Sequence, residues 1–364
     1  MNRTPKGPRA AALAFCVFLA ACASLDVKLI NQDYKKPNNV WVFFTVEDGD
    51  EPVGGLTAND FVIYEDGGEV SKFESKQIIQ NPEVAAVMYT MLLMDVSGSI
   101  TESGQADALV DAAKDFSDRV GKSQKVGVYA FDGEAKIHSV TPFTEAQGSV
   151  QGGLEGLRTR KPKDPSTNLH GAVVEGLREL KKELDKDRRP LKFGTLVVFS
   201  DGTDRANRVT RDEMLDEMKK EEYDNYEIYA IGVGAEIAEA DLDDIGRDGT
   251  VLSTDKTKVK ESFNEVAARL EQHMKRFYLL SYCSPARKGD HEVTIEANRK
   301  DPSGRGSLDS KFNADGFGPP PECDPERQPT FDMKATTEAP PPPGEAPSGG
   351  AKVKVDAKVK VQGN

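Results

Sequence analysis

Three oxygen-bearing side chains follow a strongly apolar run in "MLLMDVSGSI", residues 91–100. Asp95 ends the run, and Ser97 and Ser99 come after it at alternate positions. Carboxylate and hydroxyl oxygens suit hard cations such as Mg²⁺, Mn²⁺ and Ca²⁺ rather than zinc or copper. One carboxylate with two hydroxyls holds such an ion without neutralising it. The alternative is that these residues only cap a turn or a helix.

Two later segments offer further oxygens. In "DPSTNLHG", Thr167 lies on a loop that leads into a helical pattern over 168–185, and in "FSDG", Asp201 follows the apolar run "GTLVVFS". Ligands of an open α/β sheet bind beyond the carboxyl ends of its strands. We therefore expect three loops to converge there with two carboxylates and three hydroxyls. Each residue alone is compatible with a cap or a turn, and it is their shared edge that favours a site.

The elements that must position these residues form an alternating pattern from about residue 86. Strand-like runs such as "GTLVVFS" are continuously apolar, which is typical of parallel strands buried on both faces. Apolar residues at spacings of three and four predict helices over 105–120, 168–185 and 257–276. Strands that alternate with helices predict a doubly wound α/β domain with a mostly parallel sheet over 86–276.

Strand-like segments flank this domain on both sides. Residues 38–85 predict an N-terminal β unit, since "NNVWVFFTV" alternates in the period-two pattern of a strand. Residues 277–315 return to strand character, and they either complete that unit as a small β-sandwich-like body or form a separate hairpin. Residues 316–364 are rich in proline and glycine and end in the repeat "AKVKVDAKVKV"; we predict a disordered tail.

The motifs "DVSGS", "STNL" and "FSDG", in this order, resemble the von Willebrand factor type A (VWA) domain and its metal-ion-dependent adhesion site (MIDAS). The resemblance extends over roughly residues 86–276. It implies a bound Mg²⁺, for which Mn²⁺ or Ca²⁺ can substitute, and a carboxylate of a partner protein as a further ligand. The residues that it assigns to the ion are Asp95, Ser97, Ser99, Thr167 and Asp201.

The N-terminus has the layout of a secretory signal over residues 1–21. Three basic residues precede an apolar run that is shorter than the roughly 20 residues needed to cross a bilayer. The sequence "LAAC" resembles the lipobox of bacterial lipoproteins, which implies that Cys22 is lipidated and anchors the chain; the rival is an ordinary signal cleaved nearby. Residues 22–37 then predict a tether, and Ala23 favours the outer membrane of the cell envelope.

The net charge of the chain indicates which partners it can bind, and its cysteines indicate a disulfide. Removing the signal takes away three positive charges and no acid, so the formal net charge goes from −13 to −16. The electric field of so negative a protein repels polyanions, and we expect no nucleic-acid partner.

Two of the four cysteines lie in the signal or at its end. Cys283 and Cys323 remain in an oxidising compartment, where we predict that they form a disulfide; free thiols and intermolecular pairing are the alternatives.

Together these features predict an anchored envelope lipoprotein that is not an enzyme and that mediates metal-dependent adhesion or protein–protein interaction. The alternative is a scaffold in which the metal only stabilises the fold. A metal-dependent hydrolase is less favoured, because it needs a base and His170 is the one candidate near the motifs. Asp132 and Asp204 are expected near the same edge, either solvated or supporting the ligands.

Overall fold

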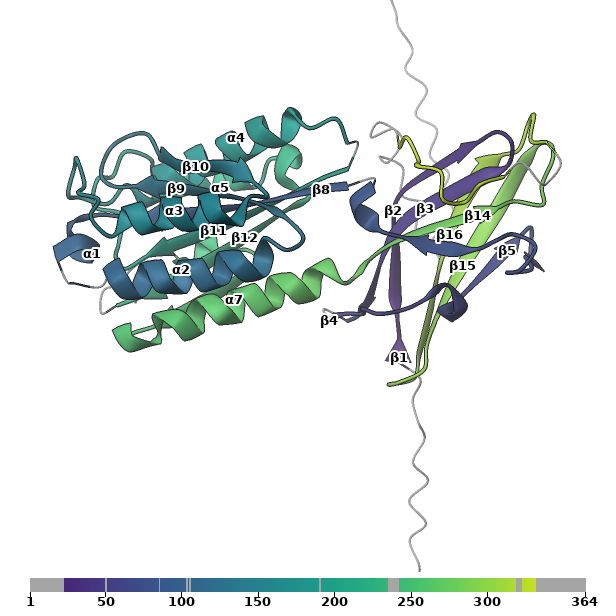
Figure 1. Cartoon of the computed structure of the whole chain (residues 1–364), viewed down its shortest axis with the longest axis horizontal. Coiled ribbons are helices and arrows are strands. Elements are labelled where there is room, and N and C mark those ends of the chain that lie inside the picture. The colour runs from purple at the N-terminus through teal and green to yellow at the C-terminus, as the bar shows by residue number, and fades with distance from the viewer. Residues whose placement is uncertain are drawn as a thin grey trace, which may run out of the picture.

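The computed structural model describes residues 23–331, apart from 50, 85, 103, 105, 190, 235–241 and 319–322. An α/β domain and a unit of two β sheets lie next to each other (Figure 1). The predicted signal peptide, Cys22 and the chain beyond Phe331 lie outside the described residues.

Six strands form the central sheet of the α/β domain in the order β10-β9-β8-β11-β12-β13. All neighbours are parallel except β10, which runs antiparallel to β9 at one edge. The mostly parallel α/β fold expected from the sequence is confirmed. The strands are β8 (Ala86–Asp95), β9 (Lys125–Phe131), β10 (His138–Thr144), β11 (Leu191–Ser200), β12 (Tyr226–Val233) and β13 (Gly249–Ser253).

Helices cover both faces of this sheet (Figure 1). The helices are α1 (Gly98–Glu102), α2 (Ala106–Val120), α3 (Gln147–Leu157), α4 (Leu169–Asp185), α5 (Arg211–Met218), α6 (Leu242–Ile245) and α7 (Val259–Met274). Successive side chains of a strand point to opposite faces. Leu92 and Met94 therefore pack in one core with α2, α3 and α7, whereas Met91 and Leu93 pack in the other with α4, α5 and α6.

The β unit is built from both ends of the described chain. One sheet has the order β1-β16-β15-β5-β6, and the other β2-β3-β14-β7, with β4 paired to β3. Because β14 pairs with β3 and β15 pairs with β5, the strands after the α/β domain join the N-terminal ones instead of forming a separate hairpin. The strands are β1 (Ala23–Ser24), β2 (Asp26–Lys35), β3 (Asn39–Asp48), β4 (Glu51–Pro52), β5 (Phe61–Glu65), β6 (Gly68–Glu69), β7 (Ile78–Gln80), β14 (Phe277–Cys283), β15 (Asp290–Arg299) and β16 (Gly304–Asn313).

One apolar cluster joins the two sheets of this unit. Val42 and Phe44 of β3 pack in it with Phe61 and Ile63 of β5, and strands β14, β15 and β16 also contribute side chains. Short 3-10 turns connect several elements. They are η1 (Ala58–Asp60), η2 (Pro82–Val84), η3 (Glu221–Tyr223) and η5 (Lys256–Lys258).

Two predicted non-regular segments are ordered parts of the fold. The tether predicted over residues 22–37 is wrong, because Asp26–Lys35 forms β2 and pairs along β3. This strand lies at a sheet edge and is half exposed, so it lacks an alternating apolar pattern. The tail predicted from residue 316 is wrong for residues 323–331, which pack on the β unit. A disulfide joins Cys323 to Cys283, with 5.9 Å between the Cα atoms.

Candidate metal centre

Asp95 lies at the carboxyl end of β8, a strand that is buried along its whole length. Its side chain has no exposed surface. The backbone N–H of Ser97 donates to Oδ1 at 2.8 Å, and the Ser200 hydroxyl donates to Oδ2 at 2.7 Å. Burial, together with the nearby charge of Asp201, raises the pKa of Asp95 to about 7, although the hydrogen bonds from Ser200 and Ser97 lower it. The fold thus keeps Asp95 in a place where the ionised form of its carboxyl group is unfavourable.

Asp201 joins Asp95 through the two serines of the first motif. The Ser99 hydroxyl donates to Oδ1 of Asp201 at 2.7 Å, and the hydroxyls of Ser97 and Ser99 lie 3.1 Å apart. Asp201 is buried, whereas Ser99 is exposed. Four of the five residues predicted for the ion therefore form one connected set of oxygen atoms that reaches solvent at Ser99.

Thr167, the fifth predicted residue, is buried on the loop before α4. Its carbonyl oxygen accepts hydrogen bonds from the backbone N–H groups of Arg205 and Ala206, both at 2.9 Å, on the loop that follows Asp201. Two residues earlier, the carbonyl of Pro165 accepts from the N–H of Gly98 at 3.0 Å, at the start of α1. The three loops are thus bonded pairwise to one another, as expected if the carboxyl ends of the strands share one edge.

Asp132 and the side chain of Asp204 are buried, so of the two expectations for these acids, that they are solvated or that they support the ligands, the first is wrong. Asp132 accepts from the N–H of Lys163 at 2.8 Å and from an N–H of its own loop, also at 2.8 Å. Asp204 accepts from the N–H of His170 at 2.8 Å and from an N–H of its own loop at 2.7 Å. Both carboxylates therefore support the backbone of the loops that carry the candidate ligands.

His170, the candidate base of a hydrolase, is buried in the first turn of α4. Its Nδ1 lies 3.2 Å from the carbonyl oxygen of Val209, on the loop before α5, and 3.6 Å from the Asp204 carboxylate. These contacts hold the imidazole against the loop and give it a packing role.

A second group of potential ligands, which the sequence analysis missed, follows β9. Ligand atoms of Asp132, Glu134 and His138 lie within 4.8 Å of one another. The spacing D-x-E-x-x-x-H across a loop between two strands was the available signal. Glu134 is already paired with His138 at 2.9 Å and with Lys163 at 3.2 Å. Because Asp132 also accepts two backbone N–H groups, we assign this group to holding the β9–β10 loop.

The chemistry of the first group fits a hard divalent cation. Its donors are oxygen atoms only, the kind that Mg²⁺ and Ca²⁺ prefer. Two of the five residues, Asp95 and Asp201, are carboxylates, both buried, and each disfavours the charge of the other. A cation beside them removes that repulsion, while the hydroxyls add ligands without adding negative charge.

Residues 90–203 match the family model of the von Willebrand factor type A domain, which supports a VWA domain in this part of the chain. The match contains all five candidate ligands. No curated protein matches the sequence significantly.

Several solved structures are similar. Proximal thread matrix protein 1 from the mussel byssus is 16% identical, with a TM-score of 0.42; the match covers 50% of this chain and 47% of that one. A second structure of it has a zinc-occupied MIDAS motif. A von Willebrand factor type A protein from Catenulispora acidiphila is 12% identical, with 80% and 73% covered and a TM-score of 0.40. The PilB minor pilin of Streptococcus sanguinis is 13% identical, with 69% and 79% covered and a TM-score of 0.41. The chain thus spans about half the length of the byssus protein.

Proposed function

We propose that this chain is a membrane-anchored lipoprotein of the bacterial envelope whose VWA domain binds a divalent cation and, through it, a carboxylate on a protein partner. The observation that carries the proposal is the convergence of three loops, far apart in sequence, on one set of oxygen-bearing residues that are buried except for Ser99. Asp95 and Asp201 are linked there through Ser97 and Ser99, and the Thr167 loop is bonded to both neighbouring loops.

The carboxylates and the hydroxyls would have different roles in such a site. The two carboxylates supply the charge that attracts the cation, and the hydroxyls supply neutral oxygen atoms. A cation held in this way supplies an electrophilic position that accepts an oxygen ligand from another protein. The residues that would hold it are Asp95, Ser97, Ser99, Thr167 and Asp201. Ser99 is the exposed member of this set, so a partner carboxylate would approach from its side.

Calorimetric titration of the chain from residue 23 with Mg²⁺ and with Mn²⁺ tests the site. We expect one ion to bind per chain, and none to bind to an Asp95→Ala variant. Because an acidic protein attracts cations nonspecifically, Asp224→Asn is the matched control. It removes one exposed charge beside the amino end of β12, at the other end of the sheet, and should leave binding unchanged. Equal binding by all three proteins would contradict the proposal.

A pull-down from envelope extract, with and without chelator, separates adhesion or assembly from a scaffold role. Metal-dependent partners should be captured by the natural chain and lost with chelator or with Asp95→Ala. If the variant folds and keeps every partner, the metal only stabilises the fold and the scaffold alternative holds. We propose Mg²⁺ as the resident ion, with Mn²⁺ or Ca²⁺ as substitutes.

The lipid anchor is proposed from "LAAC" and lies outside the described residues. No helix within the described residues is long and apolar enough to cross a membrane. Since β1 begins at Ala23, an acylated Cys22 would hold the β unit close to the bilayer surface. Mass spectrometry of the N-terminal peptide should find acyl chains on Cys22, and Cys22→Ser should release the protein from the membrane fraction. An unmodified N-terminus near residue 22 would instead show an ordinary signal peptide.

A further inference from the structure

The segment from Cys323 to Phe331, which we call the strap, crosses one face of the sheet that contains β3. Side chains of the β unit donate hydrogen bonds to its backbone carbonyls. The bonds are Lys76 Nζ to Cys323 O (3.1 Å), Asn39 Nδ2 to Asp324 O (2.5 Å), Trp41 Nε1 to Arg327 O (2.9 Å) and Gln80 Nε2 to Arg327 O (3.2 Å). Main-chain groups of the strap are therefore recognised by side chains of the sheet.

Trp41 shows how closely the strap covers this face. Its side chain has no exposed surface, and its indole N–H needs a partner when it is buried. That partner is a carbonyl of the strap at Arg327. Further along the strap, the N–H of Thr330 donates to the Asp33 carboxylate of β2 at 2.8 Å. The strap is therefore bonded to the sheet along most of its length.

The strap ends in an apolar junction between the two units. Phe331 is buried in a cluster that contains residues of both units. Trp41 and Phe43 come from β3 of the β unit, while Met88 and Leu191 come from β8 and β11 of the central sheet. The ring centroids of Phe43 and Phe331 are 6.2 Å apart, within the range of a favourable aromatic pair.

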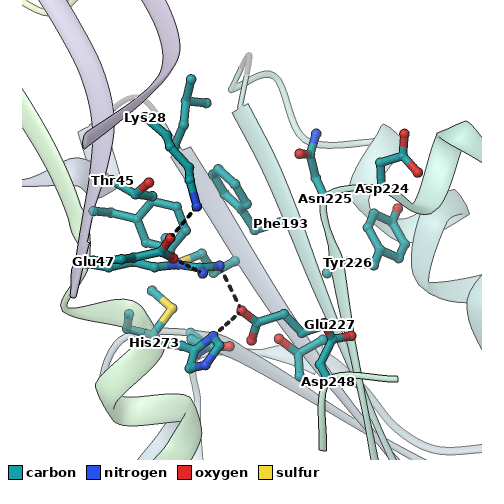
Figure 2. A pocket seen from close by; sticks show the side chains of 18 residues that line it. Lys28, Thr45, Glu47, Phe193, Asp224, Asn225, Tyr226, Glu227, Asp248 and His273 are labelled. Atoms are coloured by element: carbon teal, nitrogen blue, oxygen red, sulfur yellow. Dashed lines mark hydrogen bonds and ion pairs between the residues drawn. The ribbon is translucent and has the colours of Figure 1, made fainter. Parts of the chain in front are cut away.

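On another side of the junction, charged side chains lie beside apolar ones (Figure 2). A pocket of about 360 Å³ lies between the units there. Along its wall, Arg276 bridges Glu47 of the β unit at 2.6 Å and Glu227 of β12 at 3.1 Å, and His273 contacts the same Glu227 at 2.8 Å. Ion pairs and apolar side chains thus both attach the two units, and Phe331 belongs to the apolar part.

We propose that the strap is a clamp that holds the α/β domain on the β unit. The disulfide to Cys283 fixes its first residue, Cys323. Its last residue, Phe331, is held by packing in the junction. This face of β3 is thus covered by an internal segment of the same chain, residues 323–331. β8 runs from this junction to Asp95, so the clamp sets the position of the candidate metal centre relative to the β unit. This inference does not depend on metal binding.

The chain has a single tryptophan, and it lies under the strap, so Trp41 fluorescence reports on release. We would compare the full chain with Phe331→Ala and with the control Gln328→Ala, which changes an exposed strap residue. Phe331→Ala should shift the emission to the red and raise quenching by acrylamide, with unchanged far-UV circular dichroism. Gln328→Ala should match the natural chain. Unchanged emission in Phe331→Ala would overturn the proposal, as would an equal shift in the control.

Calorimetry tests the clamping itself. The natural chain should unfold in one transition, whereas Phe331→Ala should show two, because the units then unfold separately. A single transition in a variant whose Trp41 emission has shifted would show that the strap covers the sheet without coupling the units.

If Phe331→Ala does not fold, the double variant Cys283→Ser/Cys323→Ser frees the other end of the strap and leaves the junction residues in place. It should give the same red shift, and native emission in this variant would overturn the role of the disulfide.

Discussion

At the scale of single residues, the candidate site is a place where the chain concentrates unfavourable charge. A buried carboxylate is expensive unless hydrogen bonds or an opposite charge compensate for it. Asp95 receives one hydrogen bond on each oxygen, but its charged neighbour is Asp201, another carboxylate. The side chain of Asp204 is also largely buried, yet it accepts hydrogen bonds from two backbone N–H groups. A buried aspartate is thus suited to hold a metal ion at position 95, whereas at position 204 it stabilises the loop.

Asp95→Asn should stabilise the metal-free protein by on the order of 2 kcal/mol near pH 8. The amide oxygen can still accept from Ser97, and the Ser200 hydroxyl can turn to the carbonyl of Gly202, 3.2 Å away. Removing one of two close buried charges then lowers the energy of the folded state. The same change should abolish the rise in melting temperature that Mg²⁺ causes in the natural chain. Thermal unfolding with and without Mg²⁺ measures both effects.

Asp204→Asn is the matched control for that experiment. An amide cannot accept from both the His170 N–H and the second N–H of the loop, so this change should lower stability by about 1 kcal/mol. If the two variants shift the melting temperature in the same direction, Asp95 has a packing role like that of Asp204.

At the scale of elements, the α/β domain shows how helices are fastened to each other beside the sheet. Glu217 near the end of α5 is buried and receives hydrogen bonds from Arg178 of α4 at 2.8 Å and from Lys220 at 2.9 Å. Burial alone would raise the pKa of this carboxyl group. The two cations outweigh it and lower the pKa of Glu217 from 4.5 to about 2.

A lowered pKa in the folded state means that Glu217 stabilises the domain at pH values above about 4.5. That contribution is lost as the pH falls towards about 2, where the group becomes protonated. Glu217→Gln should therefore cost about 1 kcal/mol near pH 6, since Arg178 is half exposed and solvent screens the pair. Urea unfolding at a series of pH values should show the difference from the natural chain shrinking below pH 4.5. A difference that is constant down to pH 2 would show that the cost comes from packing and not from charge.

At the scale of the whole molecule, two units made from interleaved segments share one junction. The chain enters the β unit, passes through the α/β domain and returns, and the disulfide then closes the returning segment on itself. The candidate metal centre lies at the carboxyl end of β8, and the junction lies at its other end.

Replacing both Cys283 and Cys323 with serine should lower the free energy of unfolding of the β unit by about 4 kcal/mol, because the bond closes a loop of 40 residues in the unfolded chain. Equilibrium unfolding in urea, monitored through the fluorescence of Trp41, measures this loss of stability. The natural chain after full reduction is the control and should match the variant. A loss well below 1 kcal/mol would mean that the unfolded chain keeps these ends together without the bond.

The α/β class and the grouping of the candidate ligands followed from the sequence because both depend on local features. Strand and helix periods are visible within about ten residues, and a residue directly after a buried strand must lie at the sheet edge. Asp95, Asp201 and the Thr167 loop accordingly lie together, and their role in binding a metal stays a prediction.

Other features were decided only by contacts between segments far apart in the chain. β2 is a strand because it pairs with β3, although only two of its ten residues are buried. The strap is ordered because Asn39 and Trp41, 285 and 286 residues away from their partners, bond to its carbonyls. Every residue has the same backbone carbonyl, so contacts to carbonyls do not depend on which residues form the segment. The sequence of the strap therefore does not predict that it packs on the sheet, and only the tertiary structure shows this contact.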